Sequence, residues 1–163
     1  MKKSLLFTLI CLISFCSFSQ SSFSDIPLGE KEDYKAAEAD VIKATNYLFN
    51  SKYDKDDLER LYAIEFVMKW MGGTPDYTFE LHDKLSKPFI GETDLVGLYM
   101  AAMAKYALQN KATTPPATTV GLNAVKMIIE YSNKPSNNLK QTSEMKKIAS
   151  AMKKGSLEKY FGL

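Results

Sequence analysis

Cysteine is almost absent from this chain of 163 residues, which contains only Cys11 and Cys16. Both cysteines lie among the first nineteen residues, so a chain that begins at Gln20 has no thiol at all. Disulfides, thiolate nucleophiles and thiolate metal sites are then excluded. The remaining chain is long enough to bury a core, and its stability has to come from packing alone.

Long apolar runs are also scarce, and the clearest one stands close to the N-terminus. Two lysines precede the apolar run Leu5–Phe15, and the small-residue pattern Ser17-Phe18-Ser19 follows it. A basic segment, a short apolar segment and a small-x-small cleavage pattern are typical of a secretory signal peptide. The run is shorter than the ~20 apolar residues that a membrane-spanning helix needs.

These features predict a signal peptide at 1–19 that is cleaved before Gln20. We expect a flexible mature N-terminus at 20–32 and one helical domain at 33–163, in the periplasm or outside the cell. Cys16 is an unfavourable lipid-anchor site, because a bulky residue precedes it. No transmembrane segment is expected in the mature chain.

Arginine, histidine and tryptophan each occur once, as Arg60, His82 and Trp70. Base readout and phosphate recognition rely on arginine, so we expect no nucleic-acid partner. One histidine among carboxylates is a poor zinc site, because catalytic zinc normally has three protein ligands rich in histidine or cysteine. The aspartates at 54–57 lack the glycine and the distal glutamate of a calcium loop. We therefore expect no metal and no cofactor.

The charge is balanced overall but unevenly distributed. Without Lys2 and Lys3 the chain has equal numbers of basic and acidic residues. Residues 20–104 carry 16 acidic and 9 basic side chains, whereas residues 105–163 carry 3 acidic and 10 basic ones. Either the two halves pack together and their fields partly cancel, or the basic half binds an acidic partner such as an anionic lipid, an envelope polymer or a protein.

Helical patterns cover nearly the whole mature chain, because apolar residues recur at spacings of three and four between helix-start and helix-stop residues. We predict helices and a short terminal turn at residues 33–49, 54–71, 74–85, 94–109, 114–131, 136–155 and 157–161. Alternating apolar and polar residues are rare, so a sheet is not expected. The predicted fold is all-α, with five or six helices packed as antiparallel α-hairpins.

The second predicted helix has the best-defined start. Asp54 can cap it, with Asp57 three residues further on, and Tyr53 and Leu58 occupy the positions of a hydrophobic staple. Apolar residues on more than one side suggest that the helix is buried on several faces. Its main predicted inner face consists of Leu58, Leu61, Ile64, Met68 and Met71.

Two other helix starts are less clear. The run Thr74-Pro75-Asp76 is a helix-start pattern, yet the residues at 77, 79 and 81 alternate like those of a strand. We predict a short helix there. The run Ser136–Asn138 is expected to cap a lysine-rich helix that ends at Gly155.

One internal similarity suggests a repeat. Asp57-Leu58-x-x-Leu61-Tyr62 matches Asp94-Leu95-x-x-Leu98-Tyr99, and both sequences open a predicted core helix. The distance along the chain between the two matches, from Asp57 to Asp94, is typical of stacked helix pairs. A true repeat would make the fold a short solenoid-like stack. The alternative is that each match is simply a good helix start followed by an apolar face.

The most distinctive candidate site follows the single tryptophan. A glycine turn at 72–73 presents polar residues on a loop, and loops on rigid helices often carry function. The alternative is a tight turn between helices with a buried tryptophan, beside an ordinary surface histidine. The candidate binding residues are Trp70, Thr74, Asp76, Tyr77, Glu80, His82 and Asp83; no catalytic residue is assigned.

Two further features are candidates for contact with a partner. Lys146, Lys147, Lys153 and Lys154 form a basic face, which by default is a solvated face. Six methionines fall mostly on predicted core faces, where they either fill the core or line a groove for an apolar ligand.

The sequence thus favours an exported, non-enzymatic helical module that binds another envelope or secreted protein. An immunity or inhibitor protein would have this layout, which is an analogy only. The first alternative is a carrier of a small ligand or lipid, with a methionine-rich cavity between helices. The second is a hydrolase centred on His82 with a neighbouring carboxylate.

Overall fold

The computed structural model describes residues 23–91 and 93–163. These residues form eight α-helices and no strand, so the all-α prediction is confirmed. The α-helices are α1 (Lys31–Ala36), α2 (Glu38–Asn50), α3 (Leu58–Gly73), α4 (Asp83–Ser86), α5 (Thr93–Gln109), α6 (Ala117–Ser132), α7 (Ser143–Lys153) and α8 (Leu157–Phe161). Short 3-10 helices are η1 (Phe23–Asp25), η2 (Lys87–Phe89) and η3 (Pro135–Asn137). The predicted signal peptide lies outside the described residues.

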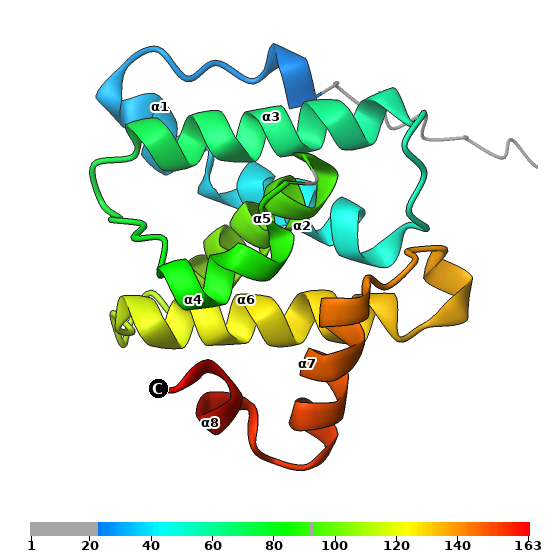
Figure 1. Cartoon of the computed structure of the whole chain (residues 1–163). Coiled ribbons are helices and arrows are strands. Elements are labelled where there is room, and N and C mark those ends of the chain that lie inside the picture. Colours follow the sequence, from blue (N-terminus) through cyan, green and yellow to red (C-terminus); the bar gives the residue numbers. More distant parts are fainter. Residues whose placement is uncertain (1–22, 92) are drawn as a thin grey trace, which may run out of the picture.

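Helix α5 lies at the centre of the bundle. It packs against α2, α3 and α6, and Figure 1 shows α3 and α6 crossing the molecule on either side of it. Ala101, Ala102 and Ala104 are fully buried, and a β-carbon placed on Gly97 would lie 2.7 Å from Cγ2 of Ile64 in α3. The small residues of α5 therefore allow neighbouring helices to approach closely.

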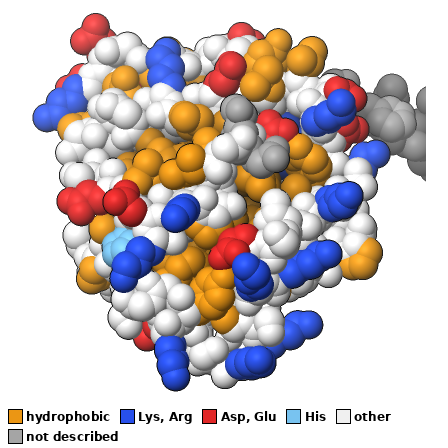
Figure 2. All heavy atoms as spheres, viewed as in Figure 1, with side chains coloured by type: hydrophobic (Ala, Val, Ile, Leu, Met, Phe, Trp, Pro, Cys, Tyr) orange, Lys and Arg blue, Asp and Glu red, His pale blue; other side chains and the backbone are white. Residues whose placement is uncertain are grey.

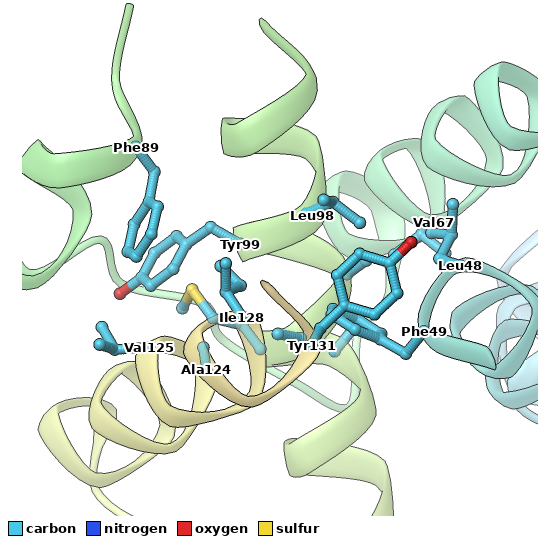
Figure 3. Close-up of a cluster of buried hydrophobic side chains, with 14 of the residues drawn as sticks. Leu48, Phe49, Val67, Phe89, Leu98, Tyr99, Ala124, Val125, Ile128 and Tyr131 are labelled. Carbon is cyan, nitrogen blue, oxygen red and sulfur yellow. The ribbon is translucent and has the colours of Figure 1, made fainter. Parts of the chain in front are cut away.

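Aromatic rings fill much of the core around α5 and α6 (Figure 3). The ring of Tyr99 stacks on that of Phe89 with 5.3 Å between centroids, and Phe49 meets Tyr131 edge-on at 5.6 Å. Burying one large apolar side chain stabilises a fold by about 1.5–3 kcal/mol. Packing of this kind provides the stability that disulfides provide in many secreted domains.

The first predicted helix is divided in two. A break at Ala37 separates α1 from α2, although neither proline nor glycine stands there. Helix α1 also begins earlier than predicted, because Asp33 forms a capping box with Glu30: its carboxylate accepts the main-chain N–H of Glu30 at 2.9 Å.

The start of α3 differs from the predicted one. Asp57, rather than Asp54, is the N-cap, and its Oδ1 accepts the main-chain N–H groups of Glu59 (3.0 Å) and Arg60 (3.4 Å). Its Oδ2 accepts the hydroxyl of Tyr47 at 2.7 Å, which ties the start of α3 to α2. This second contact is made across the fold and leaves no local signal in the sequence.

The predicted inner face of α3 is also wrong in part. Leu58, Leu61 and Met68 are 63%, 47% and 42% exposed, whereas Phe66 and Val67 are buried. Because α3 is apolar on nearly all sides, spacing alone could not identify the side that faces α2 and α5.

Residues 74–82 form an extended loop instead of the predicted helix, and α4 begins only at Asp83. The alternation seen in the sequence describes this loop in part: Tyr77 and Phe79 are half-buried, and Thr78 and Glu80 are exposed, but Leu81 is 49% exposed.

The cap of the lysine-rich helix is misplaced too. The run 136–138 belongs mostly to η3, and α7 is capped by Thr142, whose hydroxyl accepts the N–H of Met145 at 3.1 Å. The terminal turn was predicted well, since α8 buries Leu157 and Phe161, although Tyr160 is 38% exposed.

The proposed repeat finds no support in packing. Leu58 and Leu61 are exposed in α3, whereas Leu95 and Leu98 are buried in α5. The two matched segments therefore share a helix start but not an environment.

The described part of the segment 20–32 packs on the helices. The ring of Phe23 in η1 stacks on Phe66 of α3 at 6.1 Å, and Leu28 is only 5% exposed. These contacts position the chain for α1, whose residues reach the candidate site.

Candidate functional site

A pocket of about 660 Å³ opens between the loop 74–82, the start of α2 and the connection between α5 and α6. We call it the Glu38 pocket. Its lining combines charged groups with an apolar wall from α5 and α6. The lining residues are Lys35, Glu38, Asp76, Tyr77, Thr78, Phe79, Glu80, Met103, Ala107, Lys111, Ala112, Thr114, Pro115, Ala117 and Val120.

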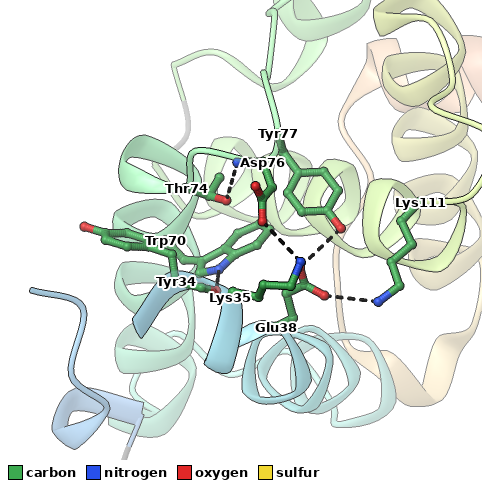
Figure 4. A network of polar contacts seen from close by, with 8 residues as sticks. All are labelled: Tyr34, Lys35, Glu38, Trp70, Thr74, Asp76, Tyr77 and Lys111. Atoms are coloured by element: carbon green, nitrogen blue, oxygen red, sulfur yellow. Dashed lines mark hydrogen bonds and ion pairs between the residues drawn. The ribbon is translucent and has the colours of Figure 1, made fainter. Parts of the chain in front are cut away.

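Trp70 holds the loop side of the pocket in place. Its indole is fully buried, and its Nε1 donates to the carbonyl of Tyr34 at 2.7 Å (Figure 4). The rings of Tyr77 and Phe79 lie 5.5 and 6.0 Å from the indole. The end of α3 therefore fixes both aromatic residues of the loop.

Gly73 makes this arrangement possible. A β-carbon at this position would lie 2.2 Å from the hydroxyl oxygen of Tyr34. The absence of a side chain at this position therefore accommodates Tyr34.

The polar part of the pocket is a network around Glu38, shown in Figure 4. Its Oε1 accepts the hydroxyl of Tyr77 at 3.4 Å, and its Oε2 accepts Nζ of Lys111 at 3.2 Å. A second pair at the rim joins Nζ of Lys35 to Oδ2 of Asp76 at 3.6 Å. The pair between Glu38 and Lys111 also joins the acidic half of the sequence to the basic half.

The carboxylate is the fixed member of the central pair. The side chain of Glu38 is only 16% exposed, whereas that of Lys111 is 64% exposed. Burial raises the pKa of Tyr77, and the nearby carboxylate of Glu38 raises it further. Tyr77 therefore remains a neutral hydrogen-bond donor over the physiological pH range.

The opposite rim of the pocket contains a strained residue. Thr114 has a φ of +44°, which β-branched residues rarely adopt. Such a conformation costs on the order of 1–3 kcal/mol and is often found at functional sites. Pro115 and Pro116 follow directly and stiffen this rim.

The structure brings only part of the predicted site together. Asp76, Tyr77 and Glu80 line the pocket, and the hydroxyl of Thr74 accepts the N–H of Asp76 at 3.4 Å just outside it. Trp70 is not a surface residue: it is fully buried and supports the aromatic residues of the loop.

His82 and Asp83 stand apart from the pocket lining. His82 is the N-cap residue of α4, and its Nδ1 is buried with no hydrogen-bond partner in the described structure. Asp83 is exposed in the first turn of α4. Within residues 23–91 and 93–163, no group of three or more histidine, cysteine or acidic residues could hold a metal ion.

Lys146, Lys147, Lys153 and Lys154 are all exposed, as predicted for a basic face, and none of them lines the Glu38 pocket. Figure 2 shows lysines along the lower edge of the molecule and apolar side chains gathered in the middle of the same face. None of the helices built from the described residues is long and apolar enough to cross a membrane.

Sequence reasoning missed Glu38, Lys111, Lys35 and the wall residues of α5 and α6. They come from segments far apart in the chain, so no motif joins them. Of the methionines considered for a cavity, only Met103 lines the Glu38 pocket; Met145 is fully buried outside it, and Met68 is exposed on α3.

Comparison with known proteins gave no match: no family model, curated protein or solved structure is significantly similar to this chain.

Proposed function

We propose that this protein is a non-enzymatic binding protein that holds a small organic molecule in the Glu38 pocket. The observation that carries the proposal is the composition of the lining, in which a mostly buried carboxylate shares one pocket with an apolar wall that includes Ala107 and Val120. Small-molecule sites are typically concave, about 300–1,000 Å³ in volume, and mostly apolar with a few fixed polar groups.

The lining favours binding over catalysis. It contains neither histidine nor cysteine, the side chains that most often act as base or nucleophile. A hydrolase centred on His82 would need a substrate site beside that residue, and the Glu38 pocket does not include it.

A pocket-filling variant tests the proposal. Ala107→Phe places a ring in the pocket from the α5 wall, and Ser150→Phe places the same ring on an exposed position of α7 as the control. A library of small amphipathic molecules is screened against all three proteins by ligand-observed NMR. Hits that bind wild type and the α7 variant but not Ala107→Phe support the proposal; an absence of hits, or equal binding by all three proteins, contradicts it.

The exposed stripe of α3 favours a second candidate function, recognition of a protein partner. Leu58, Leu61 and Met68 lie on one face of the helix and are each more than 40% exposed. The aspartates at 54–57 adjoin the stripe, so the partner would present a basic, apolar surface.

Loss of binding on substitution tests this second function. A protein recovered from envelope extracts by wild type is purified and titrated against Leu58→Glu/Leu61→Glu, with Lys153→Glu as the control on α7. Saturable binding that only the α3 variant loses supports the role. Binding that survives the α3 change, or repeated failure to recover a saturable partner, excludes it.

We also propose that the protein works outside the cytoplasm after removal of residues 1–19. The support is the leader-like sequence, with its two lysines, apolar run and small-x-small pattern. N-terminal sequencing of the protein from the periplasm or culture medium should begin at Gln20; a protein that retains Met1 in the cytoplasm would contradict the proposal.

A further inference from the structure

We propose that the ligand of the Glu38 pocket is an organic cation, a protonated amine attached to an apolar body. The inference rests on the proposed function and adds the chemical class of the ligand. It is drawn from the position of Glu38, from the amine already bound to it, and from the charges and rings of the lining.

Glu38 is placed to receive a cation. It is the first residue of α2, its side chain is 16% exposed, and the hydroxyl of Tyr77 orients one carboxylate oxygen. A carboxylate held this far from solvent attracts a cation more strongly than an exposed one, because the surrounding dielectric is lower. Charge-assisted hydrogen bonds are also stronger than neutral ones.

Lys111 shows the geometry that an amine adopts at this carboxylate. Its ammonium nitrogen lies 3.2 Å from Oε2 of Glu38, while its side chain is 64% exposed. The lysine itself is mostly exposed, so its ammonium returns to water when an arriving amine takes its place at the carboxylate. The apolar body of the ligand would then lie against Ala107 and Val120, a contact that the Lys111 side chain does not make.

The remaining charges and rings of the lining favour the same class. Three carboxylates line the pocket against two lysines, and Lys35 is 75% exposed and paired with Asp76. No cation of the lining is buried, so an anionic ligand would find only solvated, paired partners. Tyr77 and Phe79 add aromatic rings, whose faces attract cations.

The test is a matched series of octylamine, octanol and octanoate, titrated calorimetrically at neutral pH against the full mature chain. The three compounds share one apolar body and differ in the charge of the head group. We expect octylamine to bind about tenfold or more tightly than octanol, as a charge-assisted hydrogen bond implies. Octanoate should bind more weakly than octanol.

Three variants test whether Glu38 causes the preference for the amine. In Glu38→Gln the preference for the amine over the alcohol should disappear, whereas Asp83→Asn, an exposed carboxylate outside the pocket, should retain it. Lys111→Ala removes the internal competitor and should raise amine affinity several-fold. Circular dichroism melting confirms that each variant is folded before titration.

The outcomes separate the two proposals. If octanol or octanoate binds as tightly as octylamine, with binding that Ala107→Phe abolishes, the cation inference fails and the binding function stands. If Glu38→Gln retains the amine preference, the inference also fails. If none of the three compounds binds and the wider screen finds no ligand that Ala107→Phe excludes, the binding function fails.

Discussion

A β-carbon placed on Gly121 of α6 would lie 2.8 Å from the hydroxyl oxygen of Tyr99 in α5. That hydroxyl is buried and donates to no acceptor in the described structure. A polar group without a partner is therefore packed directly against a glycine in the middle of the core.

Removing this hydroxyl should stabilise the protein. Tyr99→Phe keeps the ring that stacks on Phe89 and deletes a buried group whose desolvation is uncompensated, so the free energy of unfolding should rise by about 1 kcal/mol. Urea denaturation measures the change. Tyr131→Phe is the matched control, because that hydroxyl donates to the carbonyl of Ser51 at 2.8 Å, and its loss should cost about 1 kcal/mol. Equal effects of the two changes would contradict the assignment.

The contact also predicts coupling between positions 99 and 121. Gly121→Ala gains helix propensity but meets the Tyr99 hydroxyl, so it should be less favourable in wild type than in Tyr99→Phe. A double-mutant cycle by urea denaturation should give a coupling of about 1 kcal/mol. Additive effects would show that the hydroxyl and the new methyl group do not meet.

Stability should fall at alkaline pH. Burial raises the pKa of Tyr99 to about 12, whereas an unfolded tyrosine titrates near 10. Between these two pKa values, Tyr99 is ionised in the unfolded chain but neutral in the folded protein. Its contribution to the free energy of unfolding is therefore fully present below pH ~10 and is lost as the pH rises toward the folded pKa. Unfolding free energies between neutral pH and pH ~11.5 should decline, and Tyr99→Phe should decline less. A parallel decline in the two proteins would argue against a buried Tyr99.

Replacing Arg60 by lysine should destabilise the protein. It is 3% exposed, and its Nη1 donates to the carbonyls of Leu48 and Lys52 and to the hydroxyl of Ser51, at 2.9–3.4 Å. A lysine side chain ends one bond short of Nη1 and lacks the planar group that lies 5.5 Å from the centroid of the Tyr53 ring, so Arg60→Lys should lower the free energy of unfolding by about 2 kcal/mol. Lys52→Ala is the control, because only its main chain takes part, and it should change little. A tolerated Arg60→Lys would refute the role of the contacts that Nη1 makes.

Adjacent glycines at the end of α3 should respond in opposite ways. Gly73→Ala forces a methyl group onto Tyr34 and should destabilise the protein by about 1–3 kcal/mol. Gly72 has open space where its β-carbon would be, so Gly72→Ala should stabilise α3 by about 0.5 kcal/mol. Thermal unfolding of both variants compares them directly. A similar effect at the two positions would contradict the close approach of Tyr34.

The features that were predictable from the sequence are those with local causes. Helix α5 has apolar spacing and abundant alanine, and α6 follows a proline pair, so both were located to within a few residues. Asp54 and Asp57 are both local candidates for the cap of α3, and the contact with Tyr47 that distinguishes Asp57 comes from another helix. The break at Ala37 was missed because nothing in the local sequence marks it.

The candidate site was predictable only where it lies on one continuous loop. Asp76, Tyr77 and Glu80 stood out because they follow a glycine turn and the single tryptophan. Glu38 and Lys111 are ordinary residues of an acidic and a basic segment. Only tertiary packing brings Nζ of Lys111 to 3.2 Å from Oε2 of Glu38. The orientation of α3 was undetermined for a related reason, since its apolar residues lie on several sides and the spacing does not say which side is buried.

The single tryptophan has a practical consequence for studying this protein. Because Trp70 packs against both aromatic residues of the pocket loop, its fluorescence emission arises at the site itself and from nowhere else in the chain. A ligand that shifts Tyr77 or Phe79 would change the intensity or wavelength of that emission. The natural sequence thus contains its own optical reporter, and binding can be followed without a label or an engineered probe.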